Sequence, residues 1–171
     1  PGWESVRLSR TAGAIGVRET RHLCGRHRLV LEDMVQARRF EDAVTSANFN
    51  MDIHEIDPED ERPTCPELPD GMTVRNVPMC DIPYGCLLPE AIEGLLFAGR
   101  CISGDHYTHS SYRVTGTCLA TGQAAGLAAA MAVADSVPPS AIDGRRLHRE
   151  LVDRGASFLP RDNRPQSAIN F

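Results

Sequence analysis

The feature that most constrains the fold is an uncharged run from Val114 to Ala134, which Pro138 and Pro139 follow closely. Alanine and glycine dominate it rather than leucine, isoleucine and phenylalanine, so the run lacks the hydrophobicity of a good membrane span. We therefore expect a buried helix from about Cys118 to Ala134 in a soluble, cytoplasmic protein. The two prolines should end it.

This predicted helix carries small residues at spacings of three and four, which fall on one face: Gly122, Ala125, Gly126, Ala129 and Ala130. Such a face allows a backbone or a flat ligand to approach closely. Glycine inside a helix costs about 1 kcal/mol relative to alanine, so both glycines require an offsetting contact. Tight packing on a sheet or contact with a ligand would each provide one.

The segments before the helix favour an α/β arrangement. Residues 95–99 form a continuous apolar run with the length of a buried strand, and the polar composition from Arg100 to Thr117 predicts a loop. The order of elements is therefore a strand, a polar loop and an Ala/Gly-rich helix. This order suits the edge of an α/β sheet, where ligands bind at the carboxyl ends of strands.

The remaining segments divide the chain into three parts. We expect short strands over 12–17 and 27–31, a helix over 32–43, a strand end over 51–54, and extended edges and turns among the seven prolines between Asp57 and Pro89. Asp143 should cap a further helix with Leu147, Leu151 and Val152 on one face, ending near Gly155. The predicted parts are a β-rich substrate-side segment (1–92), a strand-loop-helix segment (93–160) and a tail (161–171).

Composition excludes several kinds of chemistry. All 18 basic residues are arginine, so a Schiff-base lysine, a P-loop lysine and a kinase lysine are absent. The net charge of −5 makes nucleic acid a poor candidate partner. Six cysteines without a C-x-x-C pair are typical of reduced, mostly buried thiols.

Several stretches resemble the C-terminal signature of the bacterial FAD-dependent oxidoreductase family, whose layout is related to that of fumarate-reductase-like flavoproteins. The most specific is LLFAGRCIS at 95–103, followed by His109, Arg113 and ATGQAAG at 120–126. GVRETR at 16–21, DIH at 52–54 and IPYGCLLP at 82–89 fit the same family in the same order.

The resemblance implies an α/β fold: the C-terminal portion of a Rossmann-like FAD-binding domain with an adjoining β-rich substrate-domain segment. In the family, an N-terminal G-x-G-x-x-G turn holds the ADP part of FAD, and this sequence contains no such motif. We therefore expect a C-terminal fragment of an enzyme that transfers a hydride from a small organic substrate to FAD. Two alternatives remain: a noncatalytic subunit that completes a partner chain's flavin site, and a metal-stabilised binding module.

The expected cofactor-binding residues lie on both sides of the polar stretch: Gly99, Arg100, Cys101, Thr115, Gly116, Thr117, Cys118 and Gly122. Unpaired N–H groups and the positive dipole end of the helix suit a flavin edge that becomes negative. For Arg100, contact with the phosphates, a contribution of its backbone alone, and a surface salt bridge all remain possible.

The resemblance also implies that His109 and Arg113 handle a substrate carboxylate, since arginine binds carboxylates bidentately and histidine exchanges protons near neutral pH. The alternative is that both only hold the loop. Cys101, His106, His109 and Cys118 have a spacing that could supply a Cys2His2 zinc site, but no paired-cysteine knuckle is present and we predict no metal. We expect the charges at Arg18, Glu19 and Arg21 to form a structural cluster.

Overall fold

A computed structural model describes residues 2–156, apart from residues 3, 8, 15 and 54–65. Two strands and four α-helices form the body: α1 (Leu31–Val35), β1 (Ala43–Ala47), β2 (Cys80–Pro83), α2 (His106–Tyr112), α3 (Thr115–Asp135) and α4 (Gly144–Asp153). Three short 3-10 helices join them: η1 (Tyr84–Leu87), η2 (Gly99–Cys101) and η3 (Pro139–Ala141). The predicted tail over 161–171, together with His54 and Cys65, lies outside the described residues.

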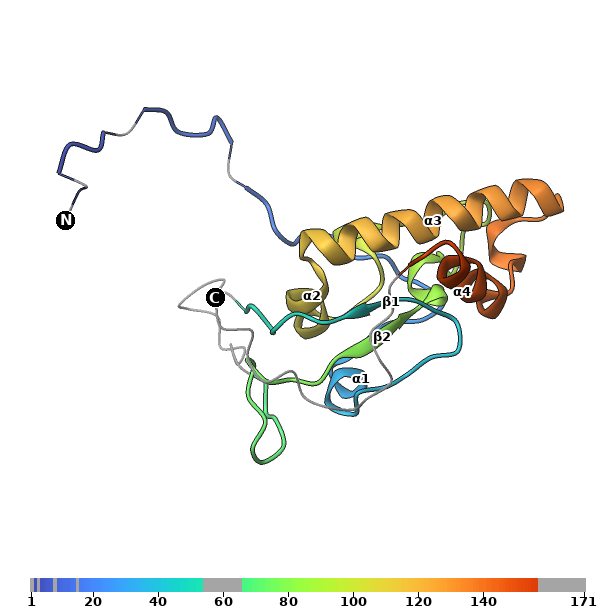
Figure 1. The fold of residues 1–171 in the computed structure, drawn as a ribbon, viewed down its shortest axis with the longest axis horizontal. Coiled ribbons are helices and arrows are strands. Elements are labelled where there is room, and N and C mark those ends of the chain that lie inside the picture. Colours follow the sequence, from blue (N-terminus) through green and yellow to red (C-terminus); the bar gives the residue numbers. More distant parts are fainter. Residues whose placement is uncertain (1, 3, 8, 15, 54–65, 157–171) are drawn as a thin grey trace.

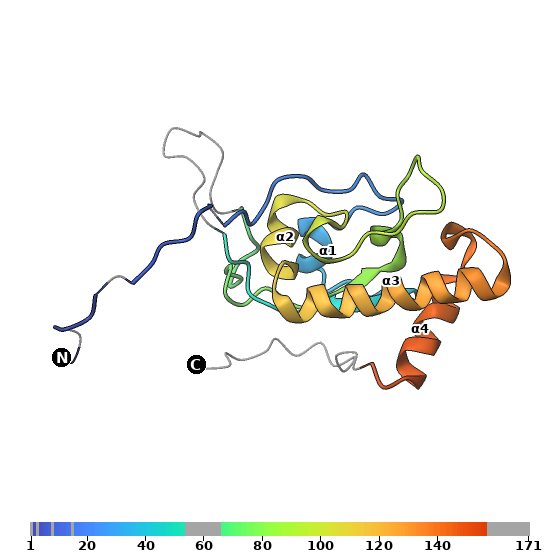
Figure 2. The same cartoon turned by 90° about the horizontal axis from the view of Figure 1, so that it is seen from above.

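The centre of the molecule is the antiparallel pair of β1 and β2, with Thr45 opposite Ile82 and Ala47 opposite Cys80. Figure 1 shows α3 lying along one side of this pair and α1 on the other. Both views place α2 at the N-terminal end of α3 and α4 at its opposite end (Figure 2). The apolar core therefore lies between the strand pair and the helices that cover it.

A buried carboxylate fastens the chain around β2. Asp81 accepts hydrogen bonds from Arg39 Nε at 2.9 Å, from the Phe40 N–H at 3.1 Å and from Ser46 Oγ at 3.0 Å. A buried charge is costly unless it is paired and hydrogen-bonded, and these three donors meet that need. The interaction joins the turn after α1 to both strands.

The prediction of a long helix is confirmed, although α3 begins at Thr115, before the expected Cys118. Its buried face consists of Thr117, Thr121, Ala124, Ala128, Met131 and Ala132. The face of small residues that carries Gly122 and Gly126 points away from this buried face. Both glycines are exposed, and a Cβ added at either meets no atom within 4 Å. Packing on the sheet thus does not explain these two glycines.

By length and composition α3 could also cross a membrane, and 33% of its most apolar stretch is buried in the chain. The core helix of a soluble protein passes the same test. Because α3 packs on β1 and α4, we interpret it as a core helix with one open face.

The predicted buried strand at 95–99 is not formed. Leu95 is 43% exposed, and the segment makes one backbone bond to η1, from the Phe97 N–H to the Leu87 carbonyl at 2.9 Å. A buried strand requires hydrogen-bonding neighbours, and no strand among the described residues lies beside this run. The mixed helices and small sheet are compatible with an α/β class.

The expected polar loop between Arg100 and Thr117 contains a helix, α2. Asp105 caps it, accepting from the Thr108 N–H at 2.8 Å and from Thr108 Oγ1 at 2.9 Å. Capping by aspartate satisfies N–H groups that the first helical turn leaves without an acceptor. The packing of Tyr112, which is fully buried, holds this short helix in place.

The N-terminal predictions need correction as well. The described residues of 12–17 form no strand and are exposed, and residues 27–31 contribute one isolated bridge, from Leu29 to Gly104. The helix predicted over 32–43 ends at Val35, while β1 was not predicted at all. By contrast, Asp143 caps α4 as expected, accepting from the Arg145 N–H at 3.0 Å.

Candidate functional site

Two segments predicted to touch the cofactor meet at the start of α3. The Gly99 N–H donates to Thr121 Oγ1 at 2.9 Å, which fastens η2 to the second turn of α3. Gly99 has a φ of +77°, in the left-handed region that glycine adopts without strain. The structure thus packs η2, which carries three of the predicted cofactor-binding residues, against α3, whose first turns carry the other five.

The surface formed there is open and has free backbone donors. In a helix whose N-cap is Val114, the N–H groups of Thr115, Gly116 and Thr117 have no acceptor within the helix, and Val114 supplies no side-chain cap. A Cβ added at Gly99, Gly116 or Gly122 meets nothing within 4 Å. A flat group carrying partial negative charge can therefore approach the helix dipole closely.

Arg100 and Cys101 use part of their polar groups within the chain. The Arg100 guanidinium donates to the Val17 carbonyl at 3.1 Å, and the Cys101 carbonyl accepts from the Leu23 N–H at 2.9 Å. Both side chains are exposed. Burial raises the pKa of the Cys118 thiol, against the opposing influence of Arg100. Of the three, Arg100 is the one whose charge can meet an anion.

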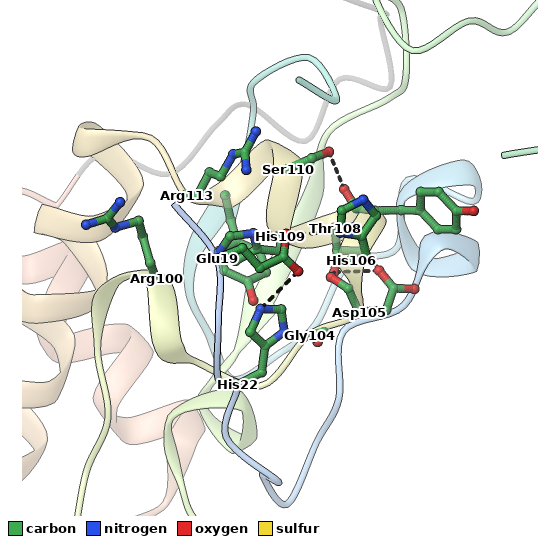
Figure 3. Close-up of polar contacts among 12 residues, drawn as sticks. Glu19, His22, Arg100, Gly104, Asp105, His106, Thr108, His109, Ser110 and Arg113 are labelled. Carbon is green, nitrogen blue, oxygen red and sulfur yellow. Dashed lines mark hydrogen bonds and ion pairs between the residues drawn. The ribbon is translucent and has the colours of Figure 1, made fainter. Parts of the chain in front are cut away.

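A cluster of polar side chains surrounds Glu19 beside α2. Three imidazole nitrogens face its carboxylate: His106 Nδ1 at 3.0 Å, His22 Nε2 at 3.2 Å and His109 Nδ1 at 3.3 Å. Figure 3 shows Glu19 with His22, His106 and His109 close around it and Arg100 apart from them. Glu19 and these three histidines are called the Glu19 cluster below.

His109 is the most buried member of the Glu19 cluster, with no exposed surface. Burial lowers its pKa to about 4; the Glu19 carboxylate opposes this, while His22, Arg113 and His106 lower the pKa further. Its ring stacks on His22 at 4.6 Å between centroids. His109 is consequently neutral near physiological pH.

Arg113 follows α2 as its C-cap, one turn after His109. Its Nη2 donates to the Asp52 carbonyl and lies 3.5 Å from the Asp52 carboxylate. The Arg113 side chain is 10% exposed, whereas that of Asp52 is 51% exposed. The structure brings the two predicted catalytic residues together on successive turns of one element.

Sequence analysis missed Glu19 and His22 as members of a site. The charges around Glu19 predicted a structural cluster, and His22 had no assigned role. The available signal was the spacing of three between Glu19 and His22, with two further histidines in α2. The Cys2His2 set that the spacing of Cys101, His106, His109 and Cys118 would allow, and that we did not predict, is not gathered in the described residues, where the potential metal-ligand group is Glu19, His22 and His109.

Comparison with known proteins identifies a family for the chain. Residues 1–151 match the model of the family described as FAD dependent oxidoreductase. The chain belongs to this family. FAD is therefore its cofactor, and the expected resemblance is confirmed. The chain matches no curated protein and no solved structure.

The residues of this FAD-dependent oxidoreductase fit one end of the cofactor. The open glycines of η2 and α3 leave room for a flat ring, and the unpaired N–H groups of α3 suit its polar edge. A G-x-G-x-x-G turn for the pyrophosphate does not occur in the 171 residues. These features suit a flat group with a partly negative edge, and the described surface offers no such turn for a pyrophosphate.

Proposed function

We propose that this chain forms the flavin-contacting part of an oxidoreductase that removes a hydride from a small organic substrate. Bound FAD supplies the two-electron acceptor. The observation that carries the proposal is the uncapped N-terminus of α3 beside the left-handed Gly99, with open space over both. In this arrangement the chain orients the ring and offsets negative charge at its N1–C2=O edge.

The physical advantage of this arrangement is preorganisation. The N–H groups of Thr115, Gly116 and Thr117 are fixed by the helix, so they need no rearrangement when charge develops next to them. The bond from Gly99 to Thr121 fixes the facing turn in the same way. We therefore assign Gly99, Arg100 and Cys101 to the ribityl side, and the first turns of α3 to the ring.

We further propose that the ADP part of FAD is bound by a segment with a G-x-G-x-x-G turn outside this sequence, as in a Rossmann-like FAD domain. The support is the absence of that turn in the 171 residues, combined with a surface that fits the flavin end alone. The apolar run at 95–99, which is only partly buried here and has no strand neighbour among the described residues, would pair with that segment's sheet. A partner chain that supplies this segment is the alternative arrangement.

Arg113 is our candidate for binding the substrate, in the form of a carboxylate. Its guanidinium fork can hold a carboxylate by two parallel hydrogen bonds. His109 was predicted to share this role, but its complete burial means that it can act only through a neighbouring group such as Glu19 or His22. The positive charge at Arg113 would thus orient the substrate, with His109 in support.

Flavin binding by the full-length gene product tests the assignment of the α3 N-terminus. Gly116→Leu places a branched side chain in the open space, so the FAD affinity should fall by about tenfold or more. Ala130→Leu is the control, because it places the same leucine side chain at an exposed position further along α3. Equal FAD affinities of the two variants, measured by fluorescence titration, would contradict the proposal.

A further inference from the structure

We propose that Glu19, His22 and His109 form a binding site for a divalent transition-metal ion of the Zn²⁺ class. The site is separate from the flavin-contacting surface of η2 and α3, and nothing in the family match assigns it. It also differs from the sequence-based expectation of no metal. The inference does not rest on the proposed hydride transfer, because the three side chains meet without any flavin.

The geometry of the three residues suits coordination of a metal. Their ligand atoms all lie within 4.8 Å of one another. His22 Nε2 lies 3.2 Å from Glu19 Oε1, and His109 Nδ1 lies 3.3 Å from Glu19 Oε2. Two ligand atoms bound tetrahedrally at about 2.0–2.1 Å from Zn²⁺ are about 3.3 Å apart. Each of the two observed separations, to a different carboxylate oxygen of Glu19, is close to this value, and the three ligand atoms are near enough for small side-chain shifts to place them around one ion.

An independent observation indicates that a ligand belongs there. His109 is completely buried, and neither of its ring nitrogens forms a hydrogen bond, although Nδ1 lies 3.3 Å from Glu19 Oε2. His22 Nε2 is also buried and lacks one. Buried polar atoms in folded proteins are nearly always hydrogen-bonded, so a group of unsatisfied nitrogens facing one carboxylate requires an explanation. A cation bound between them satisfies both His22 Nε2 and His109 Nδ1.

Neighbouring groups orient the proposed ligands. His22 Nδ1 lies 2.9 Å from the Gly104 carbonyl, which can only accept, so Nδ1 carries the proton. The lone pair is then on Nε2, the atom that faces Glu19. Metal-binding histidines typically donate their other N–H to a carbonyl or carboxylate in this way. His106 Nδ1, 3.0 Å from Glu19 Oε2, can hold the carboxylate similarly.

The donor set determines which ions fit. Two imidazoles and one carboxylate suit Zn²⁺, Co²⁺ and related ions, whereas Ca²⁺ and Mg²⁺ prefer a shell of oxygen atoms. Three protein ligands leave a position for water or another small molecule. Arg113 carries a positive charge near His109, but the Asp52 carboxylate lies 3.5 Å from its guanidinium and offsets it.

Under this proposal His109 holds a metal ion, and Arg113 remains the candidate for substrate binding. The rival metal site is the Cys2His2 set, in which His109 would act together with Cys101 and Cys118. Cys101 Sγ is exposed and contacts the Ala98 carbonyl at 3.3 Å, and neither cysteine is part of the group around Glu19. Variants of Cys101 and His22 therefore distinguish the two sites.

Metal binding is measured on the full chain after removal of metals with a chelator. Titration with Co²⁺ should give visible d–d absorption that saturates at one equivalent, and Zn²⁺ should abolish it by displacement. Glu19→Gln and His22→Ala should each lower the Zn²⁺ affinity by roughly 100-fold, and His106→Ala by roughly tenfold. His148→Ala on α4 and Cys101→Ser are the controls, and both should keep the affinity of the unaltered chain.

Circular dichroism spectra of each variant identify any that fail to fold. Because His22 and Glu19 are only partly buried, these variants should fold even if His109 does not tolerate replacement. The proposal is overturned if the folded chain binds no Co²⁺, if Glu19→Gln and His22→Ala bind as the unaltered chain does, or if Cys101→Ser is the variant that loses affinity. FAD titration of the same variants gives a separate readout, so a failure here leaves the flavin assignment unaffected.

Discussion

The backbone N–H of Gly99 donates a hydrogen bond to Thr121 Oγ1 over 2.9 Å, and the same hydroxyl donates to the Cys118 carbonyl, also over 2.9 Å. Thr121 is fully buried, and Gly99 lies in the left-handed region. One side chain therefore holds the turn of η2 against α3. The relative position of η2 and α3, the two segments that we propose contact the flavin, depends on this hydroxyl.

Replacement of Thr121 tests that dependence. Thr121→Val keeps the shape but removes the acceptor of the Gly99 N–H, so the free energy of unfolding should fall by about 1–2 kcal/mol. Thr121→Ser keeps the hydroxyl and should lose less FAD affinity than the valine variant. Urea unfolding and FAD titration provide the two measurements. If valine and serine have the same effect on FAD affinity, the bond does not position η2.

A matched pair of glycine substitutions tests the packing around α2. A Cβ at Gly104 would lie 2.7 Å from Tyr112 Cε1 and 2.9 Å from Thr108 Oγ1, whereas a Cβ at Gly122 meets nothing. Gly104→Ala should therefore destabilise the chain by about 1–3 kcal/mol. Gly122→Ala should stabilise it by up to about 1 kcal/mol, since alanine favours helix. Thermal unfolding of both variants measures the difference. A Gly104→Ala variant as stable as the unaltered chain would show that Tyr112 and Thr108 of α2 do not pack closely against Gly104.

The elements predicted best from the sequence are those whose characteristic residues lie within the element or directly beside it. Asp143 before an amphipathic stretch identified α4, and the long uncharged run identified α3, because capping and composition act within a few residues. The run at 95–99 was misread because apolar strands depend on neighbours that lie elsewhere in sequence. β1 was missed for the same reason: its five residues are held by β2, far along the chain.

In the candidate site, too, residues that lie close in sequence could be grouped from the sequence, whereas residues far apart in sequence could not. The residues proposed to bind the cofactor follow one another around a recognisable motif, so the sequence alone could group them, and their contact with FAD stays a prediction. The Glu19 cluster could not, because Glu19 and His109 are separated by most of the chain and meet only when Leu29 and Asp105 fasten the N-terminal segment beside α2. The Leu29 N–H donates to the Ser103 carbonyl, and the Asp105 N–H donates to the Leu29 carbonyl.

The cysteines should differ sharply in reactivity. Burial raises the pKa of Cys80 and of Cys86 well above the usual thiol range, and nearby carboxylates such as Asp33 raise both further. Thiolate is the reactive form, so these two should resist iodoacetamide at neutral pH while exposed Cys24 and Cys101 are alkylated. Peptide mass spectrometry gives the labelling at each position. Denatured protein is the control, and rapid native labelling of Cys80 would contradict the packing of β2.

FAD binding by the 171-residue chain alone tests the proposed division of the cofactor site. With only the ring and ribityl side of the site present, the chain should purify without colour and bind FAD weakly. Addition of a chain or segment with a G-x-G-x-x-G turn from the same enzyme should restore tight binding. Stoichiometric FAD in the isolated chain, seen as flavin absorbance, would show that these residues bind the whole cofactor.

The last prediction concerns Arg113 and the substrate. Lysine keeps the positive charge but lacks the planar fork, so Arg113→Lys in the full-length enzyme should slow flavin reduction by about 100-fold, the loss of one bidentate clamp in the transition state. Bound flavin, measured as the flavin-to-protein absorbance ratio, should stay unchanged, since we propose that η2 and α3 carry the cofactor contacts. Asp52→Ala is the control, because it removes the carboxylate next to Arg113 and keeps the guanidinium. If Arg113 only anchors the Asp52 segment, both variants should lose stability and flavin together, and single-turnover reduction of the flavin that remains should proceed at the normal rate.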